Sequence, residues 1–275
     1  MRHTLLYVLI ILLCITCTSK IKPESSILDL VPKNAPLVFK VNDFETLKDE
    51  LSTNEILQNL SGLDLFSNIT NSIRPLEHLG NQKKGLLAMS PVDSTNIGYT
   101  YISVDSLSFT NWENITNKSI ETLSYNNLNI TKYQIDDSLM FSSYVENYWV
   151  TCSSEKLLQQ LIDAIEEPNI NSSLKRFYTV SNNEKVLNIW FDIEQGNRLI
   201  NQLLTSNQKV SNFANWVSLD LTLNDTEILL NGVAESNTEA KHFLSLFNDT
   251  KPVLNKTATL VPSNADYYKS FGLDD

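Results

Sequence analysis

Between residues 85 and 152 the chain carries six short segments typical of strands, joined by turns or short stretches except for the longer connection at 105–119. They cover residues 85–92, 97–104, 120–125, 130–135, 139–145 and 148–152. The segment 130–135 alternates apolar with polar residues, which predicts a strand with one buried face. Asp136-Asp137 supplies a turn into the next segment. Because no helix separates these strands, we predict an antiparallel meander rather than a parallel βαβ array.

Amphipathic helices are predicted in the sequence before and after this meander. The clearest covers residues 155–167: Ser153 or Ser154 can cap it, Pro168 ends it, and one stripe is apolar. Further helices are predicted over residues 43–51, 55–60, 63–73, 174–180, 197–204 and 238–247, and further strands over 37–41, 186–193, 216–223 and 227–233. The predicted fold class is therefore α+β, with amphipathic helices packed on antiparallel sheet.

Internal similarity indicates a repeat. The six residues 30–35, LVPKNA, recur at 260–265 as LVPSNA, with five identities. A weaker similarity in the apolar pattern relates the strand and helix at 37–51 to those at 189–203. It is consistent either with two pseudo-repeated strand–helix halves or with ordinary amphipathic patterning. We therefore predict one domain over residues 27–259, and the start of a second repeat over 260–275.

Residues 1–26 read as an export and anchoring segment. The apolar run Leu5–Leu13 is about half of the ~20 residues needed to span a bilayer, but it fits the core of a signal peptide. Cys17 follows Thr16 at the end of this run, which resembles the lipobox of bacterial lipoproteins; Cys14 fits less well because it follows the bulky Leu13. The resemblance implies removal of residues 1–16, lipidation of Cys17 and a tether over 17–26. Ordinary secretion and an uncleaved short anchor are the alternatives.

The layout of the remaining chain is similar to that of uncharacterised envelope lipoproteins of Bacteroidetes, which carry domains of unknown function. The similarity rests on the Pro-x-Asn-Ala start, the strand and helix after it, the inner strand pair and the helix at 153–167. It implies an extracytoplasmic module in the bacterial cell envelope, at the outer membrane or the periplasmic face, whose partner is the membrane through a lipid anchor. It transfers no catalytic residues.

Composition disfavours two functional classes. With 21 Lys+Arg against 32 Asp+Glu, the net charge is −11, which argues against a nucleic acid partner. Only seven residues are glycine, which disfavours phosphate loops. The stretch from Gly80 to Gly85 has P-loop spacing, but Leu86-Leu87 replace the Lys and Ser/Thr that such loops require. We predict no cofactor.

Short motifs imitate the active-site serine enzymes that handle penicillin. Ser153-Ser154-Glu155-Lys156 matches S-x-x-K, and Ser181-Asn182-Asn183 and Lys256-Thr257-Ala258 approximate the second and third motifs. Ala258 replaces a glycine of that family, and a helix cap explains Ser153 more simply. Cys152, at the end of a predicted strand, is interpreted as a buried small hydrophobe rather than a nucleophile.

Other candidate ligand residues are scattered. His78 and His242 are isolated and lack metal-ligand spacing, so no metal site is predicted. The acidic pairs Asp136-Asp137, Glu166-Glu167 and Asp274-Asp275 are interpreted as solvated charge. Trp149, Trp190 and Trp216 lie in predicted strands and are expected in the core. Trp112 lies among polar residues and is expected to be exposed, where it could stack on a sugar.

These observations favour a non-catalytic binding or scaffold module with a protein or glycan partner. The alternatives are an exported hydrolase whose site is assembled from distant residues, and a carbohydrate-binding module. A cleft with convergent polar groups would favour the enzyme, and a flat surface would favour a scaffold.

Overall fold

The computed structural model describes residues 26–60, 62, 67, 71, 73–80, 84–93, 96–110, 112–165, 171–203, 213–236, 242–247, 249–251, 253–254, 256–265, 268 and 270. Cys17 and the predicted signal and tether up to residue 25 lie outside the described residues, as do most of the predicted helix at 63–73 and the acidic pairs at 166–167 and 274–275. Within the described part of the chain, no helix is both long and apolar enough to cross a bilayer.

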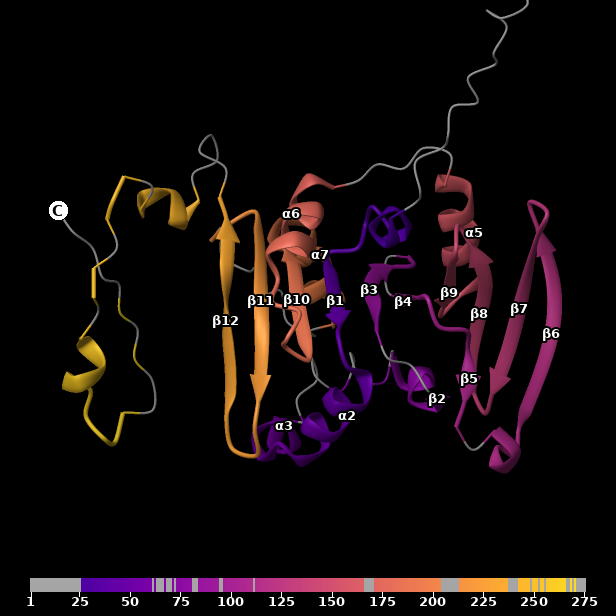
Figure 1. Ribbon diagram of the computed structural model, residues 1–275, viewed down its shortest axis with the longest axis horizontal. Coiled ribbons are helices and arrows are strands. Elements are labelled where there is room, and N and C mark those ends of the chain that lie inside the picture. Colours follow the sequence, from indigo (N-terminus) through magenta and orange to yellow (C-terminus); the bar gives the residue numbers. More distant parts are fainter. Residues whose placement is uncertain are drawn as a thin grey trace, which may run out of the picture.

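A ten-stranded antiparallel sheet dominates the described chain (Figure 1). In chain order its strands are β1 (Leu37–Val41), β3 (Gly85–Pro91), β4 (Ile97–Ser103), β6 (Lys118–Tyr125), β7 (Leu128–Ile135), β8 (Ser138–Val145), β9 (Tyr148–Cys152), β10 (Leu187–Asp192), β11 (Trp216–Leu223) and β12 (Ile228–Glu235). Their order across the sheet is β12-β11-β10-β1-β3-β4-β9-β8-β7-β6. A short pair, β2 (Leu79–Gly80) with β5 (Ser108–Phe109), forms a separate ribbon. The predicted α+β fold with antiparallel sheet is therefore confirmed.

Tight hairpins connect β6, β7, β8 and β9. Asn126 and Asn127 have φ of 46° and 63°, and Glu146 and Asn147 have φ of 47° and 73°. Two-residue turns with positive φ match the twist of the flanking strands, and Asn tolerates this conformation better than most residues. Asp136, with φ of 50°, forms the turn that the sequence predicts between β7 and β8.

Helices cover both faces of the sheet, so the central strands are buried on both sides. The larger elements are α2 (Phe44–Thr53), α3 (Glu55–Leu60), α5 (Glu155–Ala164), α6 (Ser172–Val180) and α7 (Ile193–Leu203). Short 3-10 turns add η1 (Ile27–Leu30), η2 (Arg74–His78), η3 (Trp112–Asn114), η4 (Phe243–Phe247) and η5 (Thr257–Leu260). The predicted helix at 238–247 is thus, over its described residues, the 3-10 turn η4.

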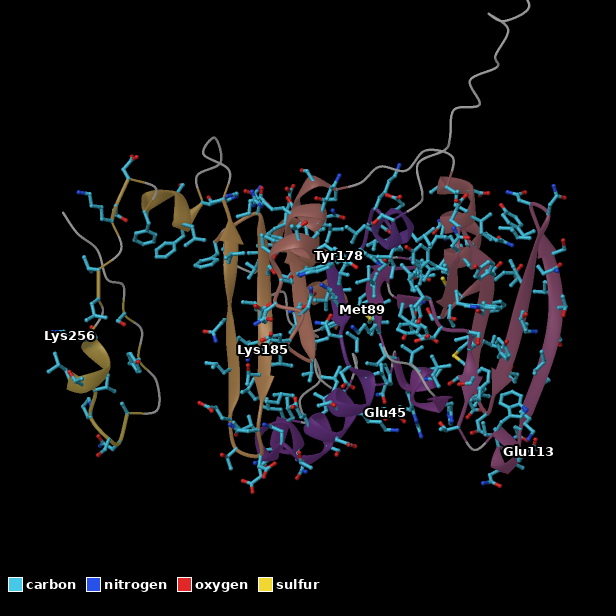
Figure 2. All side chains as sticks on the ribbon, in the orientation of Figure 1. Glu45, Met89, Glu113, Tyr178, Lys185 and Lys256 are labelled. Atoms are coloured by element: carbon cyan, nitrogen blue, oxygen red, sulfur yellow. The ribbon has the colours of Figure 1, made fainter. Side chains whose placement is uncertain are left out.

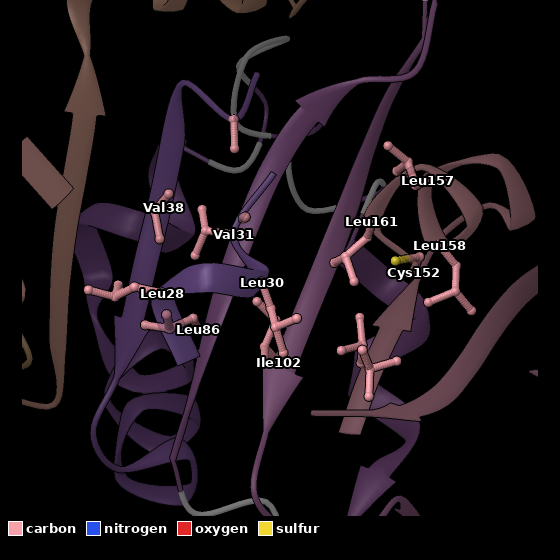
Figure 3. Close-up of a cluster of buried hydrophobic side chains, with 14 of the residues drawn as sticks. Leu28, Leu30, Val31, Val38, Leu86, Ile102, Cys152, Leu157, Leu158 and Leu161 are labelled. Carbon is pink, nitrogen blue, oxygen red and sulfur yellow. The ribbon is translucent and has the colours of Figure 1, made fainter. Parts of the chain in front are cut away.

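One core cluster joins η1, α5 and α6 to one face of the sheet. Figure 3 shows Leu28 and Leu30 of η1 on the strands near Leu86 and Ile102, and Cys152 close to Leu158 of α5. Residues that alternate with these, such as Leu87 and Met89, point to the other face and pack with Leu199 of α7. The period-two alternation of β3 therefore supplies two cores at once.

Local capping agrees with the sequence at α5. Ser154 is the N-cap, and its Oγ accepts a hydrogen bond from the Leu157 N–H over 3.3 Å. Leu157, Leu158, Leu161 and Ile162 are buried in the stripe that the sequence predicts. The helix ends at Ala164, three residues earlier than predicted, and α7 begins at Ile193, four residues earlier than predicted.

The repeated LVP-x-NA motif adopts the same local turn twice. In the first copy the Asp29 N–H donates to the Ser26 carbonyl and the Ala35 N–H to the Pro32 carbonyl, over 2.9 and 3.0 Å. In the second copy the equivalent bonds, from Thr259 to Lys256 and from Ala265 to Pro262, are both 3.1 Å. Each motif begins at the last residue of a 3-10 turn, Leu30 of η1 or Leu260 of η5.

Candidate functional site: a polar cleft beside the β2–β5 ribbon

A cleft of about 420 Å³ opens where α2, η2 and the loops around η3 meet. Its lining comes from widely separated parts of the chain: Lys48, Glu77, His78, Thr110, Asn114, Ile115, Thr116 and Asp136. Every lining residue except Ile115 has a side chain that can donate or accept a hydrogen bond. The volume lies within the ~300–1,000 Å³ of small-molecule sites, although such sites are usually more apolar.

Backbone hydrogen bonds hold the cleft walls in place. The His78 carbonyl accepts from the Thr110 N–H over 2.8 Å and from the Thr110 hydroxyl over 3.2 Å. At another part of the lining, the Asp136 N–H donates to the Asn117 carbonyl over 2.8 Å. The left-handed backbone of Asp136 and this bond fix the position of a residue that lines the cleft.

An aromatic cluster supports the loop that contributes Asn114 and Thr116. The ring of Phe109 packs against Trp112 and against Tyr133, with a centroid distance of 4.9 Å in each case. The Lys118 ammonium lies 5.4 Å from the Trp112 ring centroid and donates to the Trp112 carbonyl over 2.6 Å. Trp112 is therefore half-buried, and the prediction of an exposed stacking residue is wrong. The sequence shows its polar neighbours but cannot show Phe109 and Tyr133 folding against it.

The residues of the penicillin-enzyme motifs have separate structural roles. Ser153 Oγ accepts from the Tyr99 N–H over 3.0 Å, and Lys156 Nζ donates to the Val92 carbonyl over 3.4 Å. Ser181 Oγ donates to the Phe177 carbonyl and accepts from the Trp190 indole N–H. Lys256 lies beyond β12, at the opposite end of the molecule from α5 (Figure 2). The three motifs do not meet in one site.

The other predicted residues are also placed. Cys152 is fully buried, and burial raises the pKa of its thiol to about 12. Trp190 and Trp216 are buried, whereas Trp149 is half-buried against Tyr144. His242 Nδ1 lies 3.4 Å from the Ser236 hydroxyl, and His78 reaches the cleft. Among the described residues, no group of three or more His, Cys, Asp or Glu is placed to hold a metal ion.

A polar row within the sheet was not predicted from the sequence. Lys40, Asn188 and Asp220 lie side by side on β1, β10 and β11. Lys40 is buried; its ammonium donates to the Asn183 side chain and lies 4.4 Å from the Tyr178 ring centroid. Burial lowers the pKa of Lys40, and the nearby carboxylate of Asp220 partly offsets this effect. Asn188 Nδ2 donates to Asp220 Oδ1 over 2.7 Å. This network satisfies buried polar groups, which is a structural role.

A second hollow lies between the first LVP-x-NA turn and α5. Its volume is about 320 Å³, and its lining includes Leu30, Val31, Leu157, Leu161 and Ala164. Its lining also includes the polar residues Asp29, Lys33, Asn34 and Gln160. Asp29 already accepts a hydrogen bond from the Ser26 N–H, and Asn34 donates one to the Pro91 carbonyl.

Comparisons with known proteins do not show a family for this chain. No family model and no curated protein matches it. Among solved structures, TP0453 in its crystal form I matches over 84% of this chain and 88% of that chain, with 14% sequence identity and a TM-score of 0.39. A similarity this distant carries no functional inference.

Proposed function

We propose that this protein is an exported, lipid-anchored module of the bacterial cell envelope, and that its polar cleft binds a small polyhydroxylated ligand such as a saccharide unit. The observation that carries the proposal is the lining of the cleft: Lys48 is a donor, Glu77 and Asp136 are acceptors, and Asn114 is both. Sugar hydroxyls donate and accept at the same time, so they require such a mixed set.

The way the cleft is built supports binding. Its walls come from α2, η2 and three loops, and hydrogen bonds within the protein fix Thr110 and Asp136 before any ligand arrives. A preformed site avoids the entropic cost of ordering loops on binding. The cluster of Phe109, Trp112 and Tyr133 stiffens the loop that bears Asn114.

Binding can be tested with the chain from residue 17 onward, carrying Cys17→Ser to prevent lipidation, on a glycan array followed by calorimetry with any saccharide that binds. We expect Asp136→Asn to weaken binding about tenfold, because a charge-assisted acceptor is lost. The matched control is Asp137→Asn, an exposed neighbour that does not line the cleft. Equal effects of the two substitutions, or no saccharide binding at all, would remove this proposal.

Anchoring through Cys17 rests on the signal-like segment and its lipobox-like end. Acyl chains contribute about 0.8 kcal/mol per buried CH₂, so more than one chain on a single residue holds a folded domain at a membrane. Mass spectrometry of the mature N-terminus should find a diacylglyceryl group on Cys17. An unmodified N-terminus at any other residue would contradict the anchor.

A hydrolase is the second candidate, because Glu77 and Asp136, distant in sequence, line the same cleft. Glycoside hydrolysis uses two carboxyl groups on either side of the scissile bond. An enzyme would release reducing sugar from a bound oligosaccharide, and Glu77→Gln would abolish release while binding persists. A binding module would return the ligand unchanged.

We also propose that six neighbouring strands of the sheet, β12, β11, β10, β1, β3 and β4, consist of two related halves. In support, β1 and β10 are adjacent and antiparallel, and each is followed by a helix and then by two neighbouring strands, β3 and β4 or β11 and β12. Phe39 of β1 packs against both the core cluster that contains Leu47 of α2 and the one that contains Leu199 of α7, which is consistent with the two helices lying on one face. An experimental structure in which rotation of β1 onto β10 fails to bring α2 onto α7 would contradict this relationship.

A further inference from the structure

Lys118 is the first residue of β6 and does not line the cleft, but its side chain reaches back to the loop that does. Its ammonium donates to the Trp112 carbonyl over 2.6 Å and lies over the Trp112 ring. Three residues that line the cleft lie between these two ends: Asn114, Ile115 and Thr116. The lysine side chain therefore closes the segment 112–118 into a loop that presents part of the cleft lining.

The Trp112 carbonyl is the point at which this loop is held. It also accepts a hydrogen bond from the Ile115 N–H over 3.2 Å, so one acceptor fixes both the turn of η3 and the lysine. A hydrogen bond from a charged donor is stronger than one between neutral groups. The contact with Glu113 adds little, because its carboxylate is 3.9 Å away and its side chain is 95% exposed.

The backbone of Lys118 connects the same loop to another part of the lining. Lys118 pairs with Ile135 in the β6–β7 ladder, and Ile135 is buried. The next residue, Asp136, lines the cleft and donates its N–H to the Asn117 carbonyl over 2.8 Å. Lys118 thus joins two parts of the cleft lining, one through its side chain and one through its backbone.

We propose that Lys118 is a positioning residue for ligand binding: its ammonium holds the η3 loop so that Asn114 and Thr116 are already in place when a ligand arrives. The inference rests on the binding role proposed above for the cleft. Without this bond, a ligand would have to order residues 112–117 itself, and ordering a chain segment costs conformational entropy. Removal of the ammonium should therefore weaken binding although Lys118 does not line the cleft.

The glycan array, read over a range of protein concentrations with the chain from residue 17 carrying Cys17→Ser, measures this effect. Lys118→Met should weaken binding about tenfold, since it removes the ammonium but keeps a long side chain. Lys118→Arg should keep most of the affinity, because a guanidinium can donate to the same carbonyl.

The matched control is Lys132→Met on β7. The side chain of Lys132 is 27% exposed, against 25% for Lys118, and its ion pair with Glu121 is shorter, at 2.9 Å. Neither Lys132 nor Glu121 lines the cleft, so this variant should bind like the wild type. Urea denaturation of both variants separates an effect on the cleft from a general loss of stability.

Amide hydrogen exchange gives a second readout, which needs no ligand. Residues 112–117 should exchange faster in Lys118→Met than in the wild type or in Lys132→Met, and Lys118→Arg should restore the slower exchange. Unchanged exchange in this segment, or equal binding by Lys118→Met and the wild type, would overturn the proposal. A wild type that binds no saccharide would remove the binding role of the cleft, and the exchange measurement would then decide whether Lys118 orders its wall.

Discussion

Leu30 and Leu260 occupy equivalent positions in two copies of the same turn, but Leu30 is 2% exposed and Leu260 is 81% exposed. The turn bonds are equivalent, so local sequence determines the turn in both places. Burial differs because the first copy packs under α5 on the sheet, whereas Leu260 belongs to none of the core clusters formed by the described residues.

Leu30→Ala should lower the free energy of unfolding by about 2–5 kcal/mol, because it leaves a cavity in the core that η1 shares with α5. Leu260→Ala removes the same atoms from an exposed site and should change the free energy of unfolding by less than about 0.5 kcal/mol. Urea denaturation of both variants measures the difference. Similar losses would mean that Leu260 is buried in solution.

Ser181→Ala should destabilise the fold by about 1–3 kcal/mol, because it leaves the buried Trp190 indole N–H without its acceptor at 2.9 Å. The same substitution at the exposed Ser172 should have little effect. The measurement is the midpoint of urea unfolding, monitored by tryptophan fluorescence. An unchanged urea midpoint in Ser181→Ala would contradict the role of this hydrogen bond.

Stability should fall as the pH rises from about 9 toward 12, because of Cys152. The unfolded thiol ionises near its ordinary pKa of 9.0, whereas burial raises the folded pKa to about 12. Between these values the unfolded chain has lost a proton that the folded chain keeps, so unfolding becomes easier as pH rises, by up to about 4 kcal/mol.

Cys152→Ala should reduce the fall of stability with pH, most clearly between about pH 9 and 10. Above pH 10 the effect of the thiol is mixed with that of Tyr101, because burial raises the pKa of Tyr101 to about 12. Urea denaturation across that range is the measurement. An unchanged slope in Cys152→Ala would show that the thiol is not buried in the folded state.

Gly85→Ala should destabilise the sheet by about 1–3 kcal/mol. A Cβ at Gly85 would lie 2.7 Å from the Ile102 carbonyl oxygen on the neighbouring strand, and backbone cannot move aside as a side-chain tip can. Gly62→Ala is the matched control, since nothing lies within 4 Å of its added Cβ. Thermal unfolding of the two variants should differ by several degrees.

Much of the local structure could be predicted. The strands from 85 to 152, the turn at Asp136, and the cap and stripe of α5 agree with the sequence, because each depends on neighbours within a few residues. The half-buried Trp112 could not be predicted, since Phe109 and Tyr133 reach it only after β5 and β7 have folded.

The candidate cleft was equally hidden in the sequence. His78 looked isolated and Asp136 looked like a turn residue, and both descriptions are correct locally. Their convergence with Lys48 depends on how α2, η2 and the β7–β8 turn pack around the sheet. Of the residues that line the cleft, only His78 and Asp136 were singled out from the sequence, and neither was assigned to a ligand.

By itself the sequence determined the β3–β4 hairpin, the β6–β9 meander, the amphipathic helices and the recurrence of one turn, because hydrogen bonds and apolar periodicity act over short stretches of chain. The predicted meander is not continuous, because β4 pairs with β9 and not with β6. Only the tertiary structure decided that β1 inserts between β10 and β3, that β12 and β6 lie at the two edges of the sheet, and that polar residues meet in one cleft. These features depend on contacts between residues that are distant in the sequence. The free energy of such contacts is gained only when the whole chain packs, so no single segment determines them.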